Sequence, residues 1–273
     1  MLARVWPRRL CILALALVAG ACATTTRVPS PDANVRIDRI DQEFDLDAKI
    51  ARIAIDNPWG EINVRGRDER EVGIHAIVQR LTPSSRGVKF RTRREGDTLR
   101  ILVDYESLVA SEARPVRADI AVYVPGDLAL SLTARDGRID AKRRPGPIEA
   151  TTDSGDINAS SLGRLTLKSR SGQIRAIAIG KRWPNASEIA TESGRIVLLV
   201  PTFGDVALDA RTGGKLSTGF GLSVHATPDG GHEAHAKYGA GTSVLRARSA
   251  SGEIVLDQLV LLGDDKGLPE DDD

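Results

Sequence analysis

Carboxylates beside the turns of a repeated pattern are the side chains whose type and spacing could do acid–base chemistry. Asp153, Asp156 and Glu192 each lie within two residues of a turn glycine. Enzymes that cleave polysaccharides use two such carboxylates, whose pKa values must be driven apart. When the repeats are aligned, arginine residues flank each of the three, and nearby cations would hold all of them ionised. We therefore expect a solvated surface here rather than an active site.

The histidine and serine patterns support neither a metal site nor a nucleophile. His232 and His235 are three residues apart, whereas the zinc protease motif needs histidines at i and i+4 of a helix. On a strand these two side chains would face opposite sides. Each Ser-Gly pair lies at a turn, where both residues are expected for turn geometry alone, and the sequence has no Gly-x-Ser-x-Gly elbow. We expect a protein that is not an enzyme and uses no metal and no cofactor.

The N-terminus predicts export. Residues 1–21 begin with a basic stretch that contains Arg4, Arg8 and Arg9, and an apolar run from Leu10 to Ala21 follows. This run is shorter than the roughly 20 apolar residues that span a bilayer. It ends in small residues, as signal peptides do.

Cys22 is the predicted site of lipidation. The sequence Ala-Gly-Ala-Cys resembles a bacterial lipobox, although Ala19 stands where the usual pattern has leucine. The same residues also fit ordinary signal peptidase, so soluble export is the alternative. A lone thiol in an oxidising compartment is a liability unless it is capped, which favours the lipoprotein. Ala23 after the cysteine resembles the sorting pattern of outer-membrane lipoproteins, which face the periplasm or the cell surface.

The composition limits the class of protein. Of 273 residues, 41% are hydrophobic but only 4% are aromatic, a balance that suits thin, regular β-layers. The 38 basic and 37 acidic residues leave a formal charge of +1. Nucleic-acid-binding proteins normally carry a basic excess on one face, so no nucleic acid partner is expected.

A glycine-centred pattern recurs seven times and identifies the elements that position these side chains. Gly172 has Leu165 and Leu167 before it and Ile174 and Ala176 after it, so apolar residues stand at −7, −5, +2 and +4. The seven corner glycines are Gly60, Gly137, Gly155, Gly172, Gly194, Gly213 and Gly252, and the Gly213 copy fits only with one inserted residue. Spacing of two on both sides of a turn predicts strand–turn–strand units. We expect glycine at these corners because it tolerates positive φ.

Repetition at about twenty residues is typical of a stacked β architecture. It divides the chain into a signal peptide (1–21), a lipidated cysteine with its tether (22–34), a β-rich N-terminal part (35–127), the repeats (128–262) and a disordered acidic tail (263–273). The tail assignment rests on its run of acidic residues.

If the repeats stack in chain order, the position two residues before each corner glycine forms a charge ladder. Its members are Arg135, Asp153, Arg170, Glu192 and Arg211. Strands in a sheet lie about 4.8 Å apart, so side chains of opposite sign would meet. Each exposed pair contributes only about 0–1 kcal/mol, so the ladder's expected role is to fix the register of the stack.

The segment Ala118–Pro125 (Ala-Asp-Ile-Ala-Val-Tyr-Val-Pro), the units Thr-Asp-Ser-Gly-Asp-Ile and Ser-Arg-Ser-Gly-Gln-Ile, and the closing Ser251-Gly-Glu-Ile254 resemble one bacterial family. This is domain of unknown function 4097, which carries an adhesin label, and the likeness covers roughly residues 40–260. It implies an all-β fold, a right-handed β-solenoid or β-roll of stacked short strands, a cell-envelope location and no established catalytic residues.

Together these observations predict a non-enzymatic envelope lipoprotein that presents a binding or scaffold surface. Its expected partners are the membrane, through the N-terminal lipid anchor, and an unknown envelope protein or glycan. A carbohydrate-active β-solenoid enzyme and an envelope-stress or signalling accessory protein are the two alternatives.

Overall fold

The computed structural model describes residues 36–81, 87–105 and 116–260, all of which belong to one compact unit. The predicted signal peptide (1–21), Cys22 with its tether (22–34) and the acidic tail (263–273) lie outside the described residues. Within these ranges the chain consists of strands, turns and bends, so the prediction of an all-β fold is confirmed. The described residues contain no helix that is long and apolar enough to cross a membrane.

The strands form two mixed sheets. Sheet A has ten strands, in the spatial order β1 (Arg36–Asp45), β4 (Glu71–Arg80), β7 (Val116–Pro125), β3 (Ile62–Arg67), β9 (Ile139–Arg144), β11 (Ile157–Ser161), β13 (Ile174–Ala178), β15 (Ile196–Pro201), β21 (Ile254–Leu259) and β17 (Leu216–Thr218). Its β1–β4 and β4–β7 pairs are antiparallel and all the others are parallel.

Sheet B has eleven strands. Their spatial order is β18 (His225–Ala226), β19 (His232–Lys237), β16 (Val206–Thr212), β20 (Ser243–Ser249), β14 (Ser187–Thr191), β12 (Leu165–Ser169), β10 (Ile148–Thr152), β8 (Ala129–Ala134), β2 (Arg52–Asn57), β6 (Thr98–Asp104) and β5 (Lys89–Glu95). Antiparallel pairing is confined to β18–β19, β19–β16 and β6–β5, at the two ends of the sheet.

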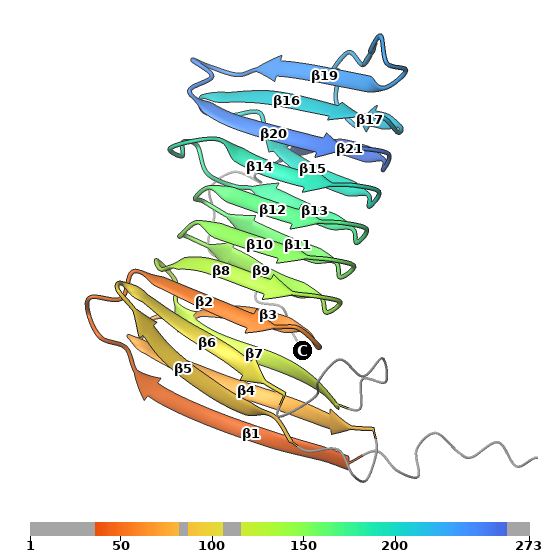
Figure 1. Cartoon of the computed structure of the whole chain (residues 1–273). Coiled ribbons are helices and arrows are strands. Elements are labelled where there is room, and N and C mark those ends of the chain that lie inside the picture. The colour runs from red at the N-terminus through yellow and green to blue at the C-terminus, as the bar shows by residue number, and fades with distance from the viewer. Residues whose placement is uncertain (1–35, 82–86, 106–115, 261–273) are drawn as a thin grey trace, which may run out of the picture. The chain divides into compact units, whose positions relative to one another are not determined.

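Each corner glycine joins a strand of sheet B to a strand of sheet A, and we call such a pair a rung. The rungs are β2/β3, β8/β9, β10/β11, β12/β13, β14/β15, β20/β21 and β16/β17, and they follow one another in this same order in both sheets (Figure 1). The spatial order departs from the chain order at one end, because β20/β21 lies between β14/β15 and β16/β17. The hairpin strand β19 already pairs with one edge of β16, so β20 can pair only with the other.

The apolar positions of the repeat form the core between the sheets. In sheet A the +2 positions make a row of isoleucines on neighbouring strands, from Ile62 through Ile139, Ile157, Ile174 and Ile196 to Ile254, and all are at most 1% exposed. The +4 row contains alanines such as Ala141 and Ala159, which are also buried. β-branched and small side chains pack well on a pleated surface, which explains how a core forms with so few aromatic residues.

The corner glycines are required by close approach between rungs rather than by backbone dihedrals. Of the seven, only Gly60 has a positive φ, at 139°, so the expected reason was wrong for the others. A β-carbon at Gly155 would lie 2.0 Å from the carbonyl oxygen of Gly137, and one at Gly172 would lie 1.9 Å from that of Gly155. At the displaced rung Gly214 faces Gly252, while Gly213 faces the carbonyl oxygen of Ala250.

Candidate binding groove

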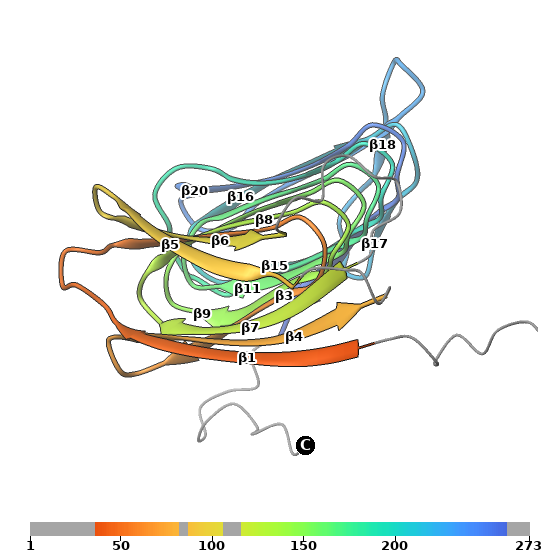
Figure 2. The same cartoon turned by 60° about the horizontal axis from the view of Figure 1, so that its bottom comes forward.

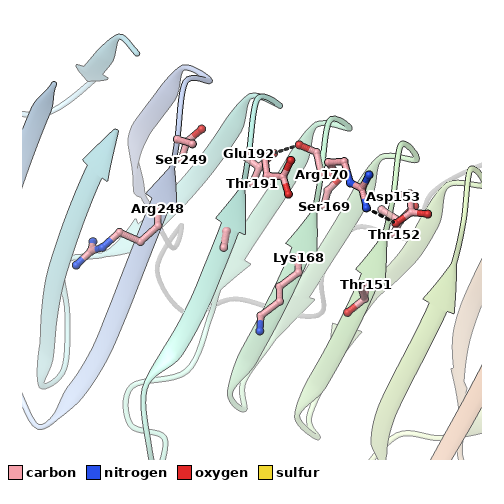
Figure 3. Close-up of a pocket in the computed structure, with 12 residues that line it drawn as sticks. Thr151, Thr152, Asp153, Lys168, Ser169, Arg170, Thr191, Glu192, Arg248 and Ser249 are labelled. Atoms are coloured by element: carbon pink, nitrogen blue, oxygen red, sulfur yellow. Dashed lines mark hydrogen bonds and ion pairs between the residues drawn. The ribbon is translucent and has the colours of Figure 1, made fainter. Parts of the chain in front are cut away.

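A shallow polar groove crosses the outer face of sheet B, where β10, β12, β14 and β20 lie side by side (Figure 3). Its volume is about 490 Å³. Since side chains alternate between the faces of a strand, the outward-facing residues near the corner ends of these four strands reach the groove. The parallel pairing sets these residues in rows that run along the stack.

Two rows of side chains form the groove. The row one residue before the strand ends is Thr151, Lys168, Ala190 and Arg248, and the row at the corners is Asp153, Arg170, Glu192 and Ala250. Figure 3 shows Lys168 and Arg248 extending from their strands, away from the corner where Asp153, Arg170 and Glu192 lie. Each row has one alanine where its neighbours have long side chains, and the two alanines together hollow the surface.

The groove carries charges of both signs. Arg170 lies 3.7 Å from Asp153, and both side chains are more than half exposed. Arg248 forms an ion pair with Asp209 on β16. Within the described part of the chain Lys168 forms no ion pair, so its ammonium group remains available to a ligand.

The carboxylates of the groove are poorly suited to general acid catalysis. A carboxyl group that must stay protonated near neutral pH needs burial in an apolar site, whereas Asp153 and Glu192 are exposed. The groove can therefore form ion pairs and hydrogen bonds, but its carboxylates lack the environment that a proton donor needs.

The predicted charge ladder is only partly assembled. Arg170 lies beside Asp153, and Glu192 directly follows the next strand, β14. Arg211 is not beside Glu192, because β20 separates β14 from β16 and Arg211 lies opposite Arg248. Its ion pair is with Asp229, 2.8 Å away. The role of the ladder in fixing register remains a prediction.

A column of buried hydroxyls lies three residues before the corner glycines, and the sequence analysis missed it. Its members at that spacing are Thr152, Ser169, Thr191 and Ser249, and Thr212, which stands opposite Ser249, adds a fifth hydroxyl one residue before Gly213. The Gly155 amide donates to the Thr152 hydroxyl at 3.0 Å, and that hydroxyl donates to the Arg135 carbonyl at 3.0 Å. Thr191 connects Gly194 and Arg170 in the same way. The recurrence of Ser or Thr at this position was the signal that would have found it.

Arg144 is a second residue that sequence reasoning missed. It is only 1% exposed and donates to the carbonyl oxygens of Val124 and Pro125, where β7 ends. Burial lowers the pKa of Arg144 to about 10. It follows Arg143, whose φ is 55°, at an irregularity in the β9–β11 pairing, and no periodic pattern marks such a position.

The histidines at 232 and 235 lie on β19. The Nδ1 of His232 donates to the Gly214 carbonyl at 2.8 Å, while His235 lies 3.4 Å from Asp209. Within the described ranges, no three His, Cys, Asp or Glu side chains come together in a way that could hold a metal ion.

Comparison with known proteins finds a solved structure with a similar fold. No protein-family model and no curated protein matches the chain. A candidate cell adhesion protein from Clostridium sporogenes matches over 82% of this chain and 100% of its own, with a TM-score of 0.51 and 10% identity. A candidate adhesin from Bacteroides fragilis matches over 81% and 97%, with a TM-score of 0.31 and 11% identity. A candidate lipid-binding protein from Parabacteroides distasonis matches over 84% and 98%, with a TM-score of 0.23 and 10% identity. At this level of identity, the first likeness shows that this chain and the Clostridium protein share a β-rich fold.

Proposed function

We propose that this chain is an exported, lipid-anchored envelope protein that acts by binding an extended polar polymer, and that its two sheets are the long faces of a right-handed β-solenoid. The identical order of the rungs in both sheets supports the solenoid. The basic and apolar segments before Cys22 support export and anchoring. The fold shared with the Clostridium protein is compatible with membership of domain of unknown function 4097 and with its adhesin label.

The register of the groove is the observation that carries the binding role. Thr151, Lys168, Ala190 and Arg248 stand on four neighbouring strands in an unbroken parallel pairing. Their spacing along the stack is about 4.8 Å, close to the repeat of one sugar unit in an extended glycan. An extended glycan chain could therefore place similar groups over successive rungs.

Binding is testable by retention of the purified full-length protein in gels that contain linear polysaccharides, polygalacturonate as the acidic one and dextran as the neutral one. Ala190→Phe fills the floor of the groove and is expected to abolish retention. Val197→Phe, at a half-buried valine on the outer face of sheet A that lines neither the groove nor another hollow described here, is the matched control and should leave retention unchanged. Retention that is absent, or equally affected by both variants, would contradict the proposed binding role.

Cleavage of a glycan is the second candidate function. Asp153 and Glu192 follow strands that lie two apart, hence about 9.6 Å at 4.8 Å per strand, just beyond the roughly 6.5–9.5 Å between the carboxyl groups of inverting glycosidases. Release of reducing ends from the polysaccharides, lost in Glu192→Gln, would support it. If no reducing ends are released, cleavage is excluded and the binding role stands as the proposal.

Anchoring is tested through Cys22. Wild-type cells labelled with radioactive palmitate should yield a labelled protein in the membrane fraction. Cys22→Ala should lose the label and move to the soluble fraction. An unlabelled wild-type protein would favour soluble export instead.

A further inference from the structure

A second hollow lies on the outer face of sheet A, on the opposite side of the molecule's core from the groove. It forms where β1, β4, β7 and β3 lie side by side (Figure 2), and its volume is about 410 Å³. These strands precede the continuous run of repeats. The hollow therefore shares no residue with the groove on sheet B.

A small residue in a polar row creates the hollow. Asp41, His75, Ala121 and Asn63 stand opposite one another on the four strands. Ala121 leaves a gap between the larger side chains of His75 and Asn63, which are two strands apart, or about 9.6 Å at 4.8 Å per strand. Such a gap admits a group of about the width of a sugar ring.

His75 is held in a defined orientation at one wall. Its Nδ1 lies 2.7 Å from Asp41 Oδ1, and its ring packs edge-to-face on Tyr123 at a centroid distance of 5.3 Å. Because the carboxylate accepts from Nδ1–H, the other ring nitrogen is left to exchange a hydrogen bond with a ligand. The partly buried Asn63 lines the opposite wall, and its Oδ1 is buried without a hydrogen-bond partner.

The charged side chains beside β3 and β7 form ion pairs with one another. Arg117 lies 2.8 Å from Asp119 and 3.3 Å from Glu61, and it offsets both carboxylates. Arg39 also lines the hollow and forms no ion pair among the described residues. With Asp41 included, acidic groups slightly outnumber basic ones, so a neutral ligand with many hydroxyls fits better than an anion.

The hollow also has an apolar part. Ile77 stands opposite Asp119 and is 47% exposed, and Ala121 forms the floor beside it. A pyranose ring presents C–H groups on its faces and hydroxyls around its edge, which matches an apolar floor ringed by Asp, Asn, His and Arg side chains. We propose that this hollow is a binding site for a neutral saccharide.

The test is calorimetric titration of the purified full-length protein with maltotriose, cellotriose and triacetylchitotriose, and with trigalacturonate as the anionic counterpart. At least one neutral trisaccharide should bind, and trigalacturonate should bind at least tenfold more weakly. Ala121→Phe should weaken neutral binding at least tenfold, and His75→Ala at least fivefold.

Two variants serve as controls. Val197→Phe adds an aromatic ring to the outer face of sheet A away from the hollow, and His225→Ala removes a histidine on β18, also outside the hollow. Both should leave trisaccharide binding unchanged. If no neutral trisaccharide binds, or if Ala121→Phe binds as well as the wild type, the proposal is overturned. If instead the groove does not bind polysaccharides, Ala190→Phe will be retained in the polysaccharide gels as the wild type is. The two proposals can therefore fail independently. Circular dichroism melts of each variant show that a loss of binding is not a loss of folding.

Discussion

The corner glycines owe their identity to the backbone of the neighbouring rung. The chain of close approaches runs from Gly60 through Gly137, Gly155, Gly172 and Gly194 to Gly252, following the spatial order of the rungs. At each step a side chain would occupy the place of a carbonyl oxygen. Glycine here allows two backbones to stack, and any larger residue would force neighbouring rungs apart.

Gly155→Ala should lower the free energy of unfolding by about 1–3 kcal/mol or more, since this is the cost of overpacking a tight site. Gly221→Ala is the matched control, because a β-carbon there meets nothing within 4 Å. Urea denaturation of both variants measures the difference. Equal stability of the two variants would refute the role of close approach.

Tyr105 makes the free energy of unfolding depend on pH in the alkaline range. Its hydroxyl shares its one proton between Asn57 Oδ1 and the Trp59 carbonyl, and burial raises the pKa of Tyr105 well above its ordinary value of 10. The folded state thus holds the proton more tightly than the unfolded state. The corresponding stability is complete below pH 10 and is lost as the pH rises further.

Tyr105→Phe should therefore reduce the fall in unfolding free energy between pH 9.5 and pH 11, on the basis of this raised pKa. Urea midpoints measured across that range give the comparison. Tyr123→Phe, at a tyrosine that is 36% exposed, is the control and should follow the wild-type curve. Parallel curves for Tyr105→Phe and the wild type would contradict the assignment.

Each strand of a rung has one face for the core and one for the surface, and β10 shows what the two faces require. Thr151 is exposed and lines the groove, whereas Thr152 is 3% exposed and bonds two backbone groups at the corner. The two residues are adjacent and chemically identical. Only the direction of the side chain separates a surface role from a structural one.

Thr152→Val should destabilise the protein by about 1–3 kcal/mol, because it leaves the buried Gly155 amide without its hydrogen-bond acceptor. Thr151→Val should change stability by less than about 0.5 kcal/mol, as an exposed substitution does. Thermal melts of the two variants compare the loss of stability at the buried face with that at the exposed face. A similar effect at both positions would mean that the corner bond is replaced by another interaction.

Stacking of interchangeable rungs also has consequences for the protein as one body. Removal of residues 156–172 joins Gly155 to Gln173 and takes out β11 and β12, so that β10 could pair with β14 and β9 with β13. Contacts in stacked repeats are made mainly between neighbours. We expect this variant to fold cooperatively with a lower melting temperature.

Removal of residues 156–163 is the control, since it deletes only half a rung. It would carry the later corner glycines to the edge opposite Gly137 and Gly155, where the close backbone contacts cannot form. This variant should be unfolded by circular dichroism. If it folds as well as the full-rung deletion, the stack does not depend on the alignment of its corners.

The β5 end of sheet B is protected against further strand pairing by charged side chains. Sheet B ends at β5, whose side chains are mostly exposed and include Arg91, Arg93 and Arg94. These arginines pair with Asp104, Glu95 and Asp47 respectively. Charged terminal strands discourage edge-to-edge association, so this basic segment has a structural explanation that needs no ligand.

The sequence by itself determined the strand–turn–strand units, the side of each strand that faces the core and the positions of the corners. It could do so because alternation with period two and turn chemistry are local properties. All apolar residues at −7, −5, +2 and +4 of the corner glycines are buried, as the pattern predicted. The recurring hydroxyl three residues before the corners was equally visible and was overlooked.

Only the tertiary structure decided which rungs are neighbours. The rung at Gly252 enters between those at Gly194 and Gly213, and this brings Arg248 into the groove and parts Arg211 from Glu192. The antiparallel addition of β1 and β4 to β7 likewise sets Asp41, His75 and Ala121 in one row. Every rung offers nearly the same edge to a partner, so the local pattern cannot rank one neighbour above another. That choice is made by hairpins such as β19, which occupy an edge and leave one place for the next strand.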